Sequence, residues 1–369
     1  MAALANTFWR DKRVFITGHT GFKGVWLSLW LQSLGAEVFG YSTSSPASFK
    51  EAKFAVPMQS SQGDICDFQK LHQALDATQP DIVFHLAAQP LVRQAFQDPI
   101  ATYEANVIGT ATLLEAVRKC KPVRAVVVVT TDKCYENREW DWAYREIDPL
   151  GGSDPYSSSK ACMELVVRSF RDSFFSIGSS DHPVGVASAR AGNMVGGGDW
   201  AKDRLVPDMM RSFAAGRPVM LRNPQAKRPW QYVLEALRGY MLLAQGLYQD
   251  ADRYAGAWNF GPNPADVRPV QWIVEKLAAA WGAEAKWDLH GGYHPQETQM
   301  LTLDCSKAAV ELLWAPVLDL SDALEMTADW YRDFYAGKTI AETYARQIAA
   351  YSLKANAKWE TLCPAFREI

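Results

Sequence analysis

A tyrosine and a lysine that could take part in proton transfer lie four residues apart. Residues 154–160 read DPYSSSK and lead into a helical pattern over residues 161–170. On a helix this spacing places Tyr156 and Lys160 on one face, one turn apart. A phenol has a pKa of about 10 and is a poor base at neutral pH, but a nearby ammonium favours the phenolate. The pair could therefore take a proton from an alcohol while hydride leaves the same carbon, although an ordinary helix can carry the same two residues.

A second polar group, Thr131-Asp132-Lys133, directly follows the apolar run of residues 124–129. Such a run predicts a central parallel strand that is covered on both faces. Ligands of open α/β sheets bind at the carboxyl ends of the strands, where these three residues would lie. A solvated loop with a local ion pair would look similar. Because Tyr156 follows after one loop, we expect both groups to meet in one crevice.

The elements that would position these groups begin near the N-terminus. Residues 13–17 are apolar and β-branched, and Gly18, Gly21 and Gly24 follow before a helical pattern over residues 25–34. Strand, glycine loop and helix are the context of a dinucleotide fold, in which the glycines allow a tight turn and close approach of a pyrophosphate. The helix N-terminus adds N–H donors for phosphate. The pattern therefore predicts dinucleotide binding rather than a simple turn.

The predicted second strand, residues 37–42, does not identify the dinucleotide. It runs into Ser42-Thr43-Ser44-Ser45 and lacks the acidic residue that would bind the adenosine ribose of NAD. It also lacks an arginine for the additional phosphate of NADP. We expect NAD and leave the choice between the two open.

Strands and helices alternate through the rest of the first half. Strands are expected to end at residues 63–65 and to cover 81–86, 124–129 and 184–190, with helices over 68–76 and 103–117. This alternation predicts an α/β fold with a doubly wound parallel sheet. His85, at the end of one strand, is expected to be structural.

Sheet periodicity fades after residue 190, and we expect a smaller C-terminal α/β domain that binds the substrate. The predicted division gives residues 1–192 and about 230–262 to the dinucleotide-binding domain, and about 193–229 and 263–369 to the second domain. Short strands are expected near residues 218–221, 258–262 and 287. Helices are expected over 206–215, 236–248, 270–281, from 306, 320–335 and 341–351, the last two as an amphipathic tail.

Composition restricts the class of protein. The chain has 369 residues, 48% hydrophobic and 21% charged, with a net charge of −3, so no global basic field for nucleic acid or an anionic membrane is present. No apolar run approaches the roughly 20 residues of a membrane helix, and residues 1–11 do not resemble a signal peptide. Six scattered cysteines favour free thiols in a reducing cytosol over disulfides or a zinc site, and no metal is expected.

Together these motifs carry a family resemblance. The glycine loop, residues 85–89 (HLAAQ), Thr131-Asp132-Lys133 and Tyr156-x-x-x-Lys160 resemble an extended short-chain dehydrogenase/reductase with a Rossmann domain. More narrowly, they resemble the NAD-dependent sugar-nucleotide 4,6-dehydratases, and residues 190–200 and 228–233 extend the similarity. The resemblance covers residues 13 to about 307. Most members have Thr-Asp-Glu in the loop, whereas Thr-Asp-Lys is the variant associated with members that act on CDP-D-glucose.

The resemblance implies dehydration of CDP-D-glucose to CDP-4-dehydro-6-deoxy-D-glucose, a hydro-lyase reaction in deoxysugar and O-antigen lipopolysaccharide precursor synthesis. Tyr156 would deprotonate the C4 hydroxyl while hydride passes to NAD, with Thr131 bonded to the same oxygen and Lys160 lowering the tyrosine pKa. A protonated Asp132 would donate to the departing C6 hydroxyl, and hydride would return to C6 from a cofactor that stays bound. Lys133 stands where the family has its C5 base. It would act as a neutral base, or as a cation that stabilises the enolate.

The resemblance also implies the binding residues. For the cofactor they are Gly18, His19, Gly21, Phe22, Lys23, Gly24, Asp64, Ile65, Leu86, Ala87, Ala88, Gln89, Asn106, Tyr156 and Lys160. For the nucleotide sugar they are Gln89, Asn193, Arg204 and Arg228, where the two arginines suit a pyrophosphate, and Trp200 or Trp230 could stack on the base.

Other functions remain open at this point. They are a dTDP- or GDP-hexose 4,6-dehydratase, a sugar-nucleotide 4-epimerase of the same family, and a non-catalytic dinucleotide-binding sensor. The resemblance further implies a cytoplasmic homodimer that pairs through the helices of residues 103–117 and 155–170.

Overall fold

The computed structural model describes residues 6–44, 49, 57–176, 183–221, 223–282, 285–289 and 301–362. Ser45, Cys363 and the first five residues, which enter the predictions above, lie outside these ranges. Within them, no helix is both long enough and apolar enough to cross a lipid bilayer. The described cysteines are free thiols: Cys66, Cys120, Cys134, Cys162 and Cys305.

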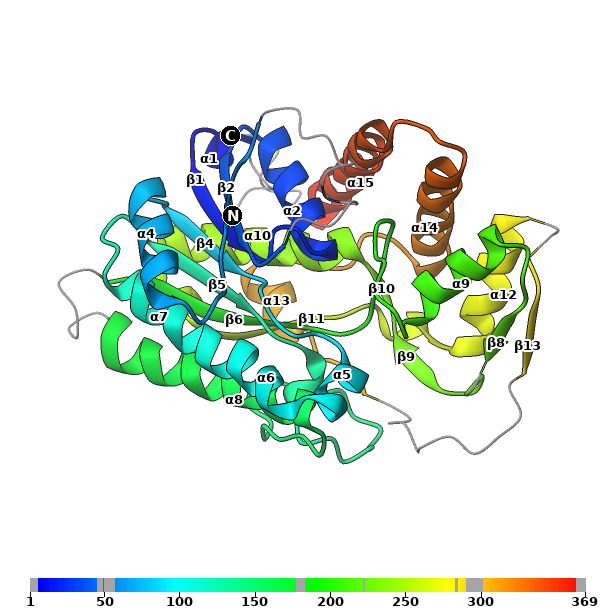
Figure 1. Ribbon diagram of the computed structural model, residues 1–369, viewed down its shortest axis with the longest axis horizontal. Coiled ribbons are helices and arrows are strands. Elements are labelled where there is room, and N and C mark those ends of the chain that lie inside the picture. The colour runs from blue at the N-terminus through cyan, green and yellow to red at the C-terminus, as the bar shows by residue number, and fades with distance from the viewer. Residues whose placement is uncertain are drawn as a thin grey trace.

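The predicted doubly wound sheet is confirmed. Seven strands pair in parallel in the order β11-β6-β5-β4-β1-β2-β3, and Figure 1 shows them crossing the larger lobe of the molecule. The strands are β1 (Arg13–Thr17), β2 (Glu37–Ser42), β3 (Gln59–Gln62), β4 (Ile82–His85), β5 (Ala125–Val129), β6 (Gly185–Ala191) and β11 (Gly256–Phe260). The chain reverses its direction of winding between β1 and β4, and such a switch point forms a crevice at the carboxyl edge.

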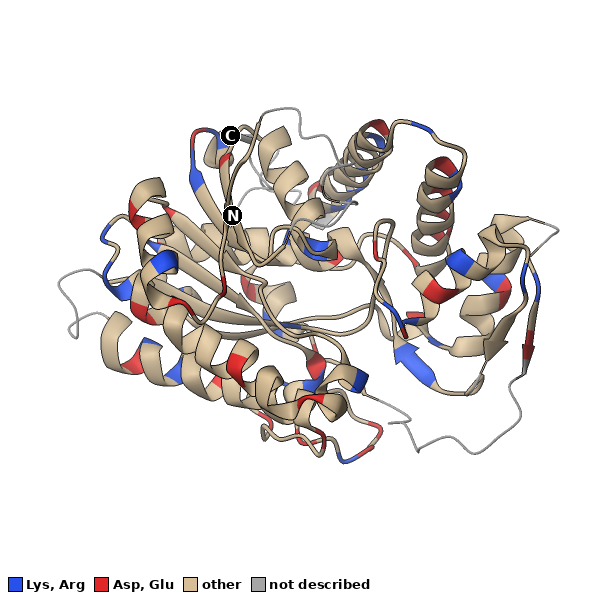
Figure 2. Ribbon diagram, viewed as in Figure 1, with Lys and Arg blue, Asp and Glu red and all other residues tan. Residues whose placement is uncertain are grey.

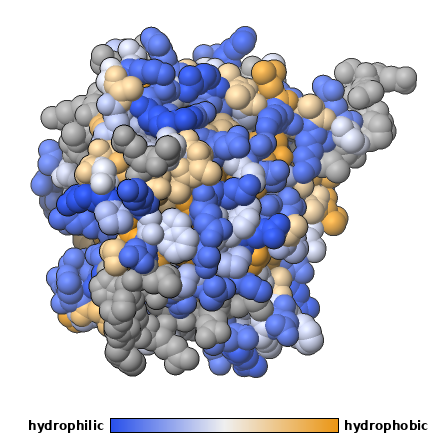
Figure 3. All heavy atoms as spheres, turned by 90° about the vertical axis from the view of Figure 1, so that its right-hand side faces the viewer, coloured by the Kyte–Doolittle hydropathy of each residue, from blue (hydrophilic) through white to orange (hydrophobic). Residues whose placement is uncertain are grey.

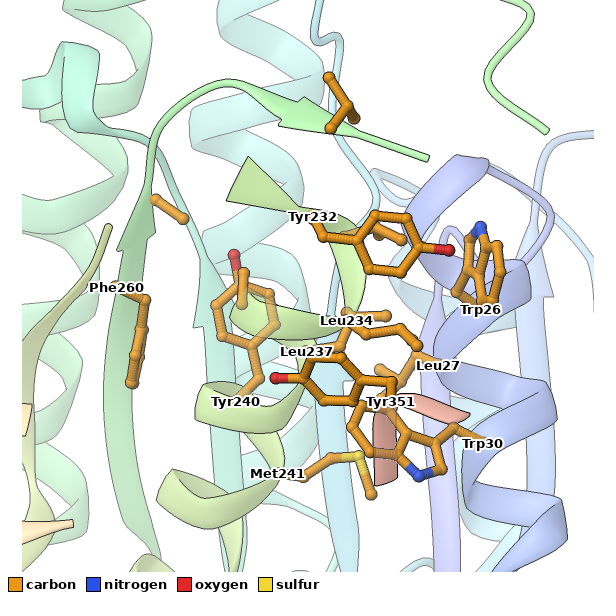
Figure 4. Close-up of a cluster of buried hydrophobic side chains, with 14 of the residues drawn as sticks. Trp26, Leu27, Trp30, Tyr232, Leu234, Leu237, Tyr240, Met241, Phe260 and Tyr351 are labelled. Atoms are coloured by element: carbon orange, nitrogen blue, oxygen red, sulfur yellow. The ribbon is translucent and has the colours of Figure 1, made fainter. Parts of the chain in front are cut away.

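Helices cover both faces of the sheet, as the apolar strands require. In β5 every residue is buried, and Val126 and Val128 face one layer while Val127 and Val129 face the other. One layer contains α4 (Phe68–Thr78), α7 (Gly109–Arg118) and α8 (Pro155–Phe170). The other contains α2 (Phe22–Ser33), α10 (Val233–Gln249) and part of α15 (Ile340–Leu362). Figure 4 shows the second layer, in which the labelled side chains interlock: Trp26, Leu27, Trp30, Tyr232, Leu234, Leu237, Tyr240, Met241, Phe260 and Tyr351.

Several helices differ in extent from the predictions. α2 begins at Phe22 and so includes Gly24 of the glycine loop. The long helix predicted over residues 103–117 is composed of α6 (Pro99–Tyr103), a π-helical turn (Glu104–Ile108) and α7. The short α5 (Val92–Gln97) precedes it, and a second π-helical turn (Arg171–Phe175) extends α8.

A smaller lobe lies beyond the carboxyl edge of the sheet (Figure 1). It contains the helices α9 (Leu205–Ala214), α12 (Val270–Trp281) and α14 (Leu320–Tyr335), and the strand pairs β8 (Val219–Leu221) with β13 (Trp287–Leu289) and β9 (Lys227–Pro229) with β12 (Val267–Pro269). A further parallel pair joins β7 (Met194–Val195) to β10 (Gln231–Tyr232). Figure 2 shows acidic and basic residues interspersed over both lobes, in keeping with the small net charge. On the side shown in Figure 3, hydrophilic residues surround small apolar patches.

The two C-terminal helices are amphipathic, as predicted, but their apolar faces pack into the core, so they do not form a tail. α13 (Ser306–Glu311) contacts β11, and α15 contacts both α14 and α2. The Tyr351 hydroxyl donates to Glu235 Oε2 at 2.6 Å, and the Tyr344 ring lies 4.5 Å from that of Trp26. These helices therefore hold the two lobes together.

Candidate active site

The glycine loop packs tightly at the carboxyl end of β1. Gly18 has a φ of +72°, and a Cβ there would lie 2.7 Å from the Ala87 amide nitrogen. A Cβ on Gly24 would lie 2.4 Å from the Gly18 carbonyl oxygen. Gly21 caps α2 without a side-chain hydrogen bond, and the first turn contains no acidic residue. The first N–H groups of this helix are therefore available to an anion, and the loop fits the diphosphate of a dinucleotide.

Two residues of this loop can carry a positive charge, His19 and Lys23, and their side chains point in different directions. The ring of His19 is buried against Phe49, and its Nε2 lies 2.8 Å from Ser60 Oγ. Burial lowers the pKa of His19 to about 4, so the imidazole is neutral. Lys23 extends toward the catalytic residues. Burial and the charge of Arg204 lower its pKa to about 8, while Asp132 and Asp199 oppose that shift.

The two candidate catalytic groups are brought together, as predicted. The Thr131 hydroxyl lies close enough to that of Tyr156 to favour the phenolate, and its Oγ1 donates to Asp132 Oδ1 at 2.9 Å. Asp132 begins a short 3₁₀ turn (Asp132–Cys134) after β5, and Tyr156 lies in the first turn of α8, which Asp154 caps by accepting from the Ser157 amide. A potential base and a potential acid thus lie on either side of one hydroxyl.

The expected depression of the Tyr156 pKa is not found. Burial raises it to about 12, although the nearby Thr131 hydroxyl and the charge of Arg204 both favour the phenolate. Lys160 lies on the same helix, but its Nζ donates to Met163 Sδ at 3.2 Å. Burial and Lys23 lower its own pKa to about 7. Spacing alone could not reveal this, because desolvation disfavours the charged form of both groups.

Asp132 has the property that a general acid needs. It is 4% exposed, and burial raises its pKa even though Lys133, Thr131 and Arg228 favour the carboxylate. The negative charge of an ionised Asp132 would disfavour the Tyr156 phenolate, so protonation of Asp132 and ionisation of Tyr156 favour each other. Lys133 completes the group, with its Nζ 6.0 Å from the centre of the Tyr156 ring.

The segment after β4 reaches this group through Asn106. The side chain of Asn106 accepts from the Gln89 amide at 2.8 Å and donates to Ser159 Oγ at 2.8 Å, and Ser159 in turn donates to the Tyr156 carbonyl. The Gln89 side chain bonds Leu91 and Thr102. Both amides are therefore engaged within the protein and hold the loop and α8 in register.

The other predicted cofactor residues line the same edge of the sheet. Leu86 and Ala87 bond to Thr17, and Ala88 is half-buried beside them. Phe22 lies near Gly196 at the junction with the smaller lobe. Two residues follow β3: Asp64 is exposed, with its carbonyl accepting from Tyr41, and Ile65 is buried against Gly109.

The predicted substrate arginines approach from the smaller lobe. Arg204 Nη1 donates to Asp199 Oδ2 at 3.0 Å, and its charge acts on both Lys23 and Tyr156. Arg228, in β9, acts on Asp132. Asn193 contributes its carbonyl to the Gln231 amide, and its side chain is half-buried.

The two candidate base-stacking residues are packed into the protein. Trp230 is only 6% exposed, which leaves no ring face free for stacking. The ring of Trp200 contacts α14, with its centroid 4.8 Å from that of Phe334 and 5.3 Å from that of Tyr331. Among the described residues, no group of three or more His, Cys, Asp or Glu side chains could hold a metal ion.

One buried charged pair was missed by the sequence reasoning. Glu164 lies one turn after Lys160 on α8 and pairs with Arg190 of β6 at 2.8 Å. The only signal was the continued spacing of four, Tyr156, Lys160 and Glu164, along one helix face.

Known proteins resemble this chain over most of its length. A family model described as GDP-mannose 4,6 dehydratase matches residues 15–327. CDP-glucose 4,6-dehydratase of Salmonella typhimurium is 49% identical over 348 residues, which cover 93% of this chain and 97% of that protein. A dTDP-glucose 4,6-dehydratase of Haemophilus influenzae is 26% identical over 73% of this chain and 81% of its own.

Solved structures show the same fold. A dTDP-glucose 4,6-dehydratase from Streptomyces venezuelae, solved with NAD bound, superposes with a TM-score of 0.75 at 24% identity, covering 88% of this chain and 98% of its own. A UDP-glucose 4-epimerase from Stenotrophomonas maltophila gives a TM-score of 0.76 at 21% identity, covering 89% and 100%. On the extent of the family match and the identity to the Salmonella protein, this chain belongs to the GDP-mannose 4,6-dehydratase family.

Proposed function

We propose that this protein is a CDP-glucose 4,6-dehydratase, a hydro-lyase that converts CDP-D-glucose to CDP-4-dehydro-6-deoxy-D-glucose. The observation that carries the proposal is the hydroxyl of Thr131, which donates to Asp132 at 2.9 Å and lies close enough to the Tyr156 hydroxyl to act on its pKa. Oxidation at C4 and loss of the C6 hydroxyl need a base and an acid on one sugar ring. A single hydroxyl placed beside both groups supports that arrangement, and the 49% identity to a protein of this name supports the substrate.

The residues divide the chemistry between them. Tyr156 takes the proton of the C4 hydroxyl, and Thr131 bonds the same oxygen. Asp132, whose pKa is raised by burial, then donates its proton to the departing C6 hydroxyl. Lys133 lies beside the Tyr156 ring and serves the C5 position in one of two ways, as a neutral base or as a cation that stabilises the enolate.

NAD is the proposed cofactor, and when bound it accepts hydride from C4 and returns it to C6. The glycine loop and the N-terminus of α2 would hold its diphosphate, because their N–H groups have no side-chain cap. Lys160 and Lys23 would lie near its negative charges, which would raise the lowered pKa values of both ammonium groups. Asn106 and Gln89 would act by fixing the loop after β4.

The nucleotide sugar would lie between the lobes. We assign its diphosphate to Arg204 and Arg228, which approach the catalytic residues from the smaller lobe, with Asn193 nearby. Arg204 would exchange its bond to Asp199 for a phosphate oxygen, since a guanidinium binds either anion in the same geometry. The smaller domain is proposed to comprise residues 193–229 and much of 263–369, with α13 and α15 bridging to the sheet.

The test is direct. Incubation of the NAD-loaded protein with CDP-D-glucose is expected to give a 4-keto-6-deoxy sugar, which develops ultraviolet absorbance in alkali. A panel of CDP-, dTDP-, UDP- and GDP-hexoses identifies the base that is accepted. No absorbance with any of the four would contradict a dehydratase, and an epimerase would interconvert hexoses without this product.

We further propose a cytoplasmic homodimer that serves deoxysugar synthesis, including precursors of lipopolysaccharide. Helices α5 to α8 contact one another and expose a set of large apolar side chains: Phe96, Ile100, Ile108, Leu165 and Phe174. A second copy of the chain would cover this layer.

Leu165→Asp, from the 55% exposed residue at the centre of α8, is expected to give a monomer in sedimentation analysis. Met220→Asp, from a 48% exposed residue in the smaller lobe, should not. If both variants sediment like the parent, the interface lies elsewhere.

A further inference from the structure

A buried carboxylate joins the two halves of the proposed catalytic group. Glu164 is 4% exposed and lies on α8, the helix of Tyr156 and Lys160. Its Oε1 accepts from Thr130 Oγ1 at 2.5 Å. Its Oε2 accepts from Ser188 Oγ at 2.6 Å and from Arg190 Nη2 at 2.8 Å. Arg190 and these hydrogen bonds hold the pKa of Glu164 below its usual value despite burial, so the carboxylate is ionised.

The same network reaches the other end of the turn that follows β5, from Thr131 to Tyr135, which we call the catalytic turn. Arg190 Nη1 donates to the Tyr135 hydroxyl at 2.8 Å and to the Glu146 carbonyl at 3.2 Å. Tyr135 in turn donates to Asn259 Oδ1 at 2.8 Å. Thr130 directly precedes Thr131 and Asp132, and Tyr135 closes the turn that they begin. The turn is therefore held at both ends, because Thr130 and Tyr135 each hydrogen-bond to the Glu164–Arg190 pair.

This arrangement connects groups that the chain places on separate elements. Thr131 and Asp132 follow β5, whereas Tyr156 and Lys160 belong to α8, and a loop of twenty residues (135–154) separates them. The bond between Thr130 and Glu164 is a direct link from the base of the turn to that helix. Catalytic groups must be held within about 1 Å of their productive positions, because larger displacements cost roughly 10²-fold in rate.

We propose that Glu164 is a positioning residue for the dehydration, which fixes the Thr131–Lys133 turn against Tyr156 through its bond to Thr130. The proposal rests on the proposed function. The alternative is a buried ion pair that contributes only to the stability of the sheet.

Two matched variants separate these roles. Glu164→Gln would leave Arg190 buried without a counter-charge and is expected to fold poorly. Thr130→Val and Ser188→Ala each remove one hydroxyl donor to Glu164, from residues that are 3% and 2% exposed. Only Thr130 adjoins the catalytic turn, because Ser188 lies in the middle of β6. Because each variant loses one hydrogen bond to Glu164, both should lose similar thermal stability.

The turnover numbers of the two variants distinguish a positioning role of Glu164 from a role in stability alone. With the NAD-loaded protein and the nucleotide sugar that the parent accepts, Thr130→Val should lower kcat roughly 10- to 100-fold and leave KM within about twofold. Ser188→Ala should keep kcat within about twofold of the parent. Equal losses of kcat in the two variants, or no loss in Thr130→Val, would overturn the positioning role.

A second readout does not depend on turnover. Cys134 lies in the catalytic turn and is fully buried, and burial raises the pKa of its thiol, so it should resist alkylation in the folded protein. Loosening of the turn in Thr130→Val should speed iodoacetamide labelling of Cys134 by about tenfold or more, read by mass spectrometry, while Ser188→Ala labels at the parental rate. If the parent dehydrates no nucleotide sugar but the labelling rates differ, the proposed function fails and the anchoring of the turn stands. Equal labelling rates in the two variants would refute the anchoring in either case.

Discussion

Replacing Asp132 by asparagine should remove activity and increase stability in the same variant. Burial raises the pKa of this carboxyl group, so the folded protein resists its ionisation. A carboxyl whose pKa is raised in the folded state contributes fully to stability below its unfolded pKa of about 3.9, and that contribution is lost as pH rises toward the folded value. Each unit of difference corresponds to about 1.4 kcal/mol. Asparagine has nearly the same shape and does not titrate, so the variant does not incur this loss.

The expected shift in melting temperature follows from the length of the chain. Relief of an imperfectly compensated buried charge is worth about 1–3 kcal/mol. With about 2.1 cal/mol/K of unfolding entropy per residue, the 369 residues give roughly 0.8 kcal/mol/K. Asp132→Asn should therefore raise the melting temperature by about 1–4 °C near pH 8. The gap between variant and parent should narrow as pH falls and become constant above the folded-state pKa.

The assay pairs melting curves between pH 5.5 and 9 with product formation from CDP-D-glucose, in preparations with the same NAD content. Loss of the general acid should lower the rate of product formation by about 10²- to 10⁴-fold. Asp199→Asn is the matched control, since Asp199 accepts from Arg204 at 3.0 Å and its replacement should lower stability. A melting temperature of Asp132→Asn that is below the parental value, or a gap that does not change with pH, would refute the buried neutral carboxyl. Parental turnover would refute its role as the acid.

Three further predictions test the site and its support. Lys133→Ala should leave reduction of bound NAD by the substrate detectable at 340 nm but block loss of water, and dehydration at the parental rate would show that Lys133 is not essential. Tyr156→Phe should lower turnover by about 10²- to 10⁴-fold with little change in melting temperature, and a loss below tenfold would exclude it as the base. Gly197→Ala should lower stability by about 1–3 kcal/mol in urea unfolding, because its Cβ would lie 1.9 Å from Trp330 Cγ. Gly216→Ala, whose Cβ would meet nothing within 4 Å but whose φ is +63°, should cost about 1 kcal/mol, and a loss there larger than that of Gly197→Ala would refute the packing argument.

The local sequence pattern was sufficient to predict the sheet and the edge of the sheet at which the candidate site lies. The run at residues 125–129 is buried on both faces because every residue is apolar, and a strand of that kind has few alternatives to a covered parallel sheet. The glycine loop likewise follows from short-range requirements, since a Cβ on Gly18 or Gly24 would collide with neighbouring backbone. The carboxyl edge of such a sheet places Asp132 at the end of β5, and the N-terminus of α8 brings Tyr156 to the same edge.

Burial and long-range pairing were decided by the tertiary structure. The sequence places Tyr156 and Lys160 on one helix face, but the pKa of a phenol depends on how much water surrounds it, and burial reverses the expected direction. Asn106 and Gln89 were predicted as ligand contacts, and the hydrogen bonds that join them across 17 residues could not be read from the sequence. Glu164 and Arg190, 26 residues apart, and Tyr351 and Glu235, 116 apart, have no local signature. The spacing of a few residues specifies helices, turns and faces, but desolvation and pairing between distant residues exist only once the whole chain has packed.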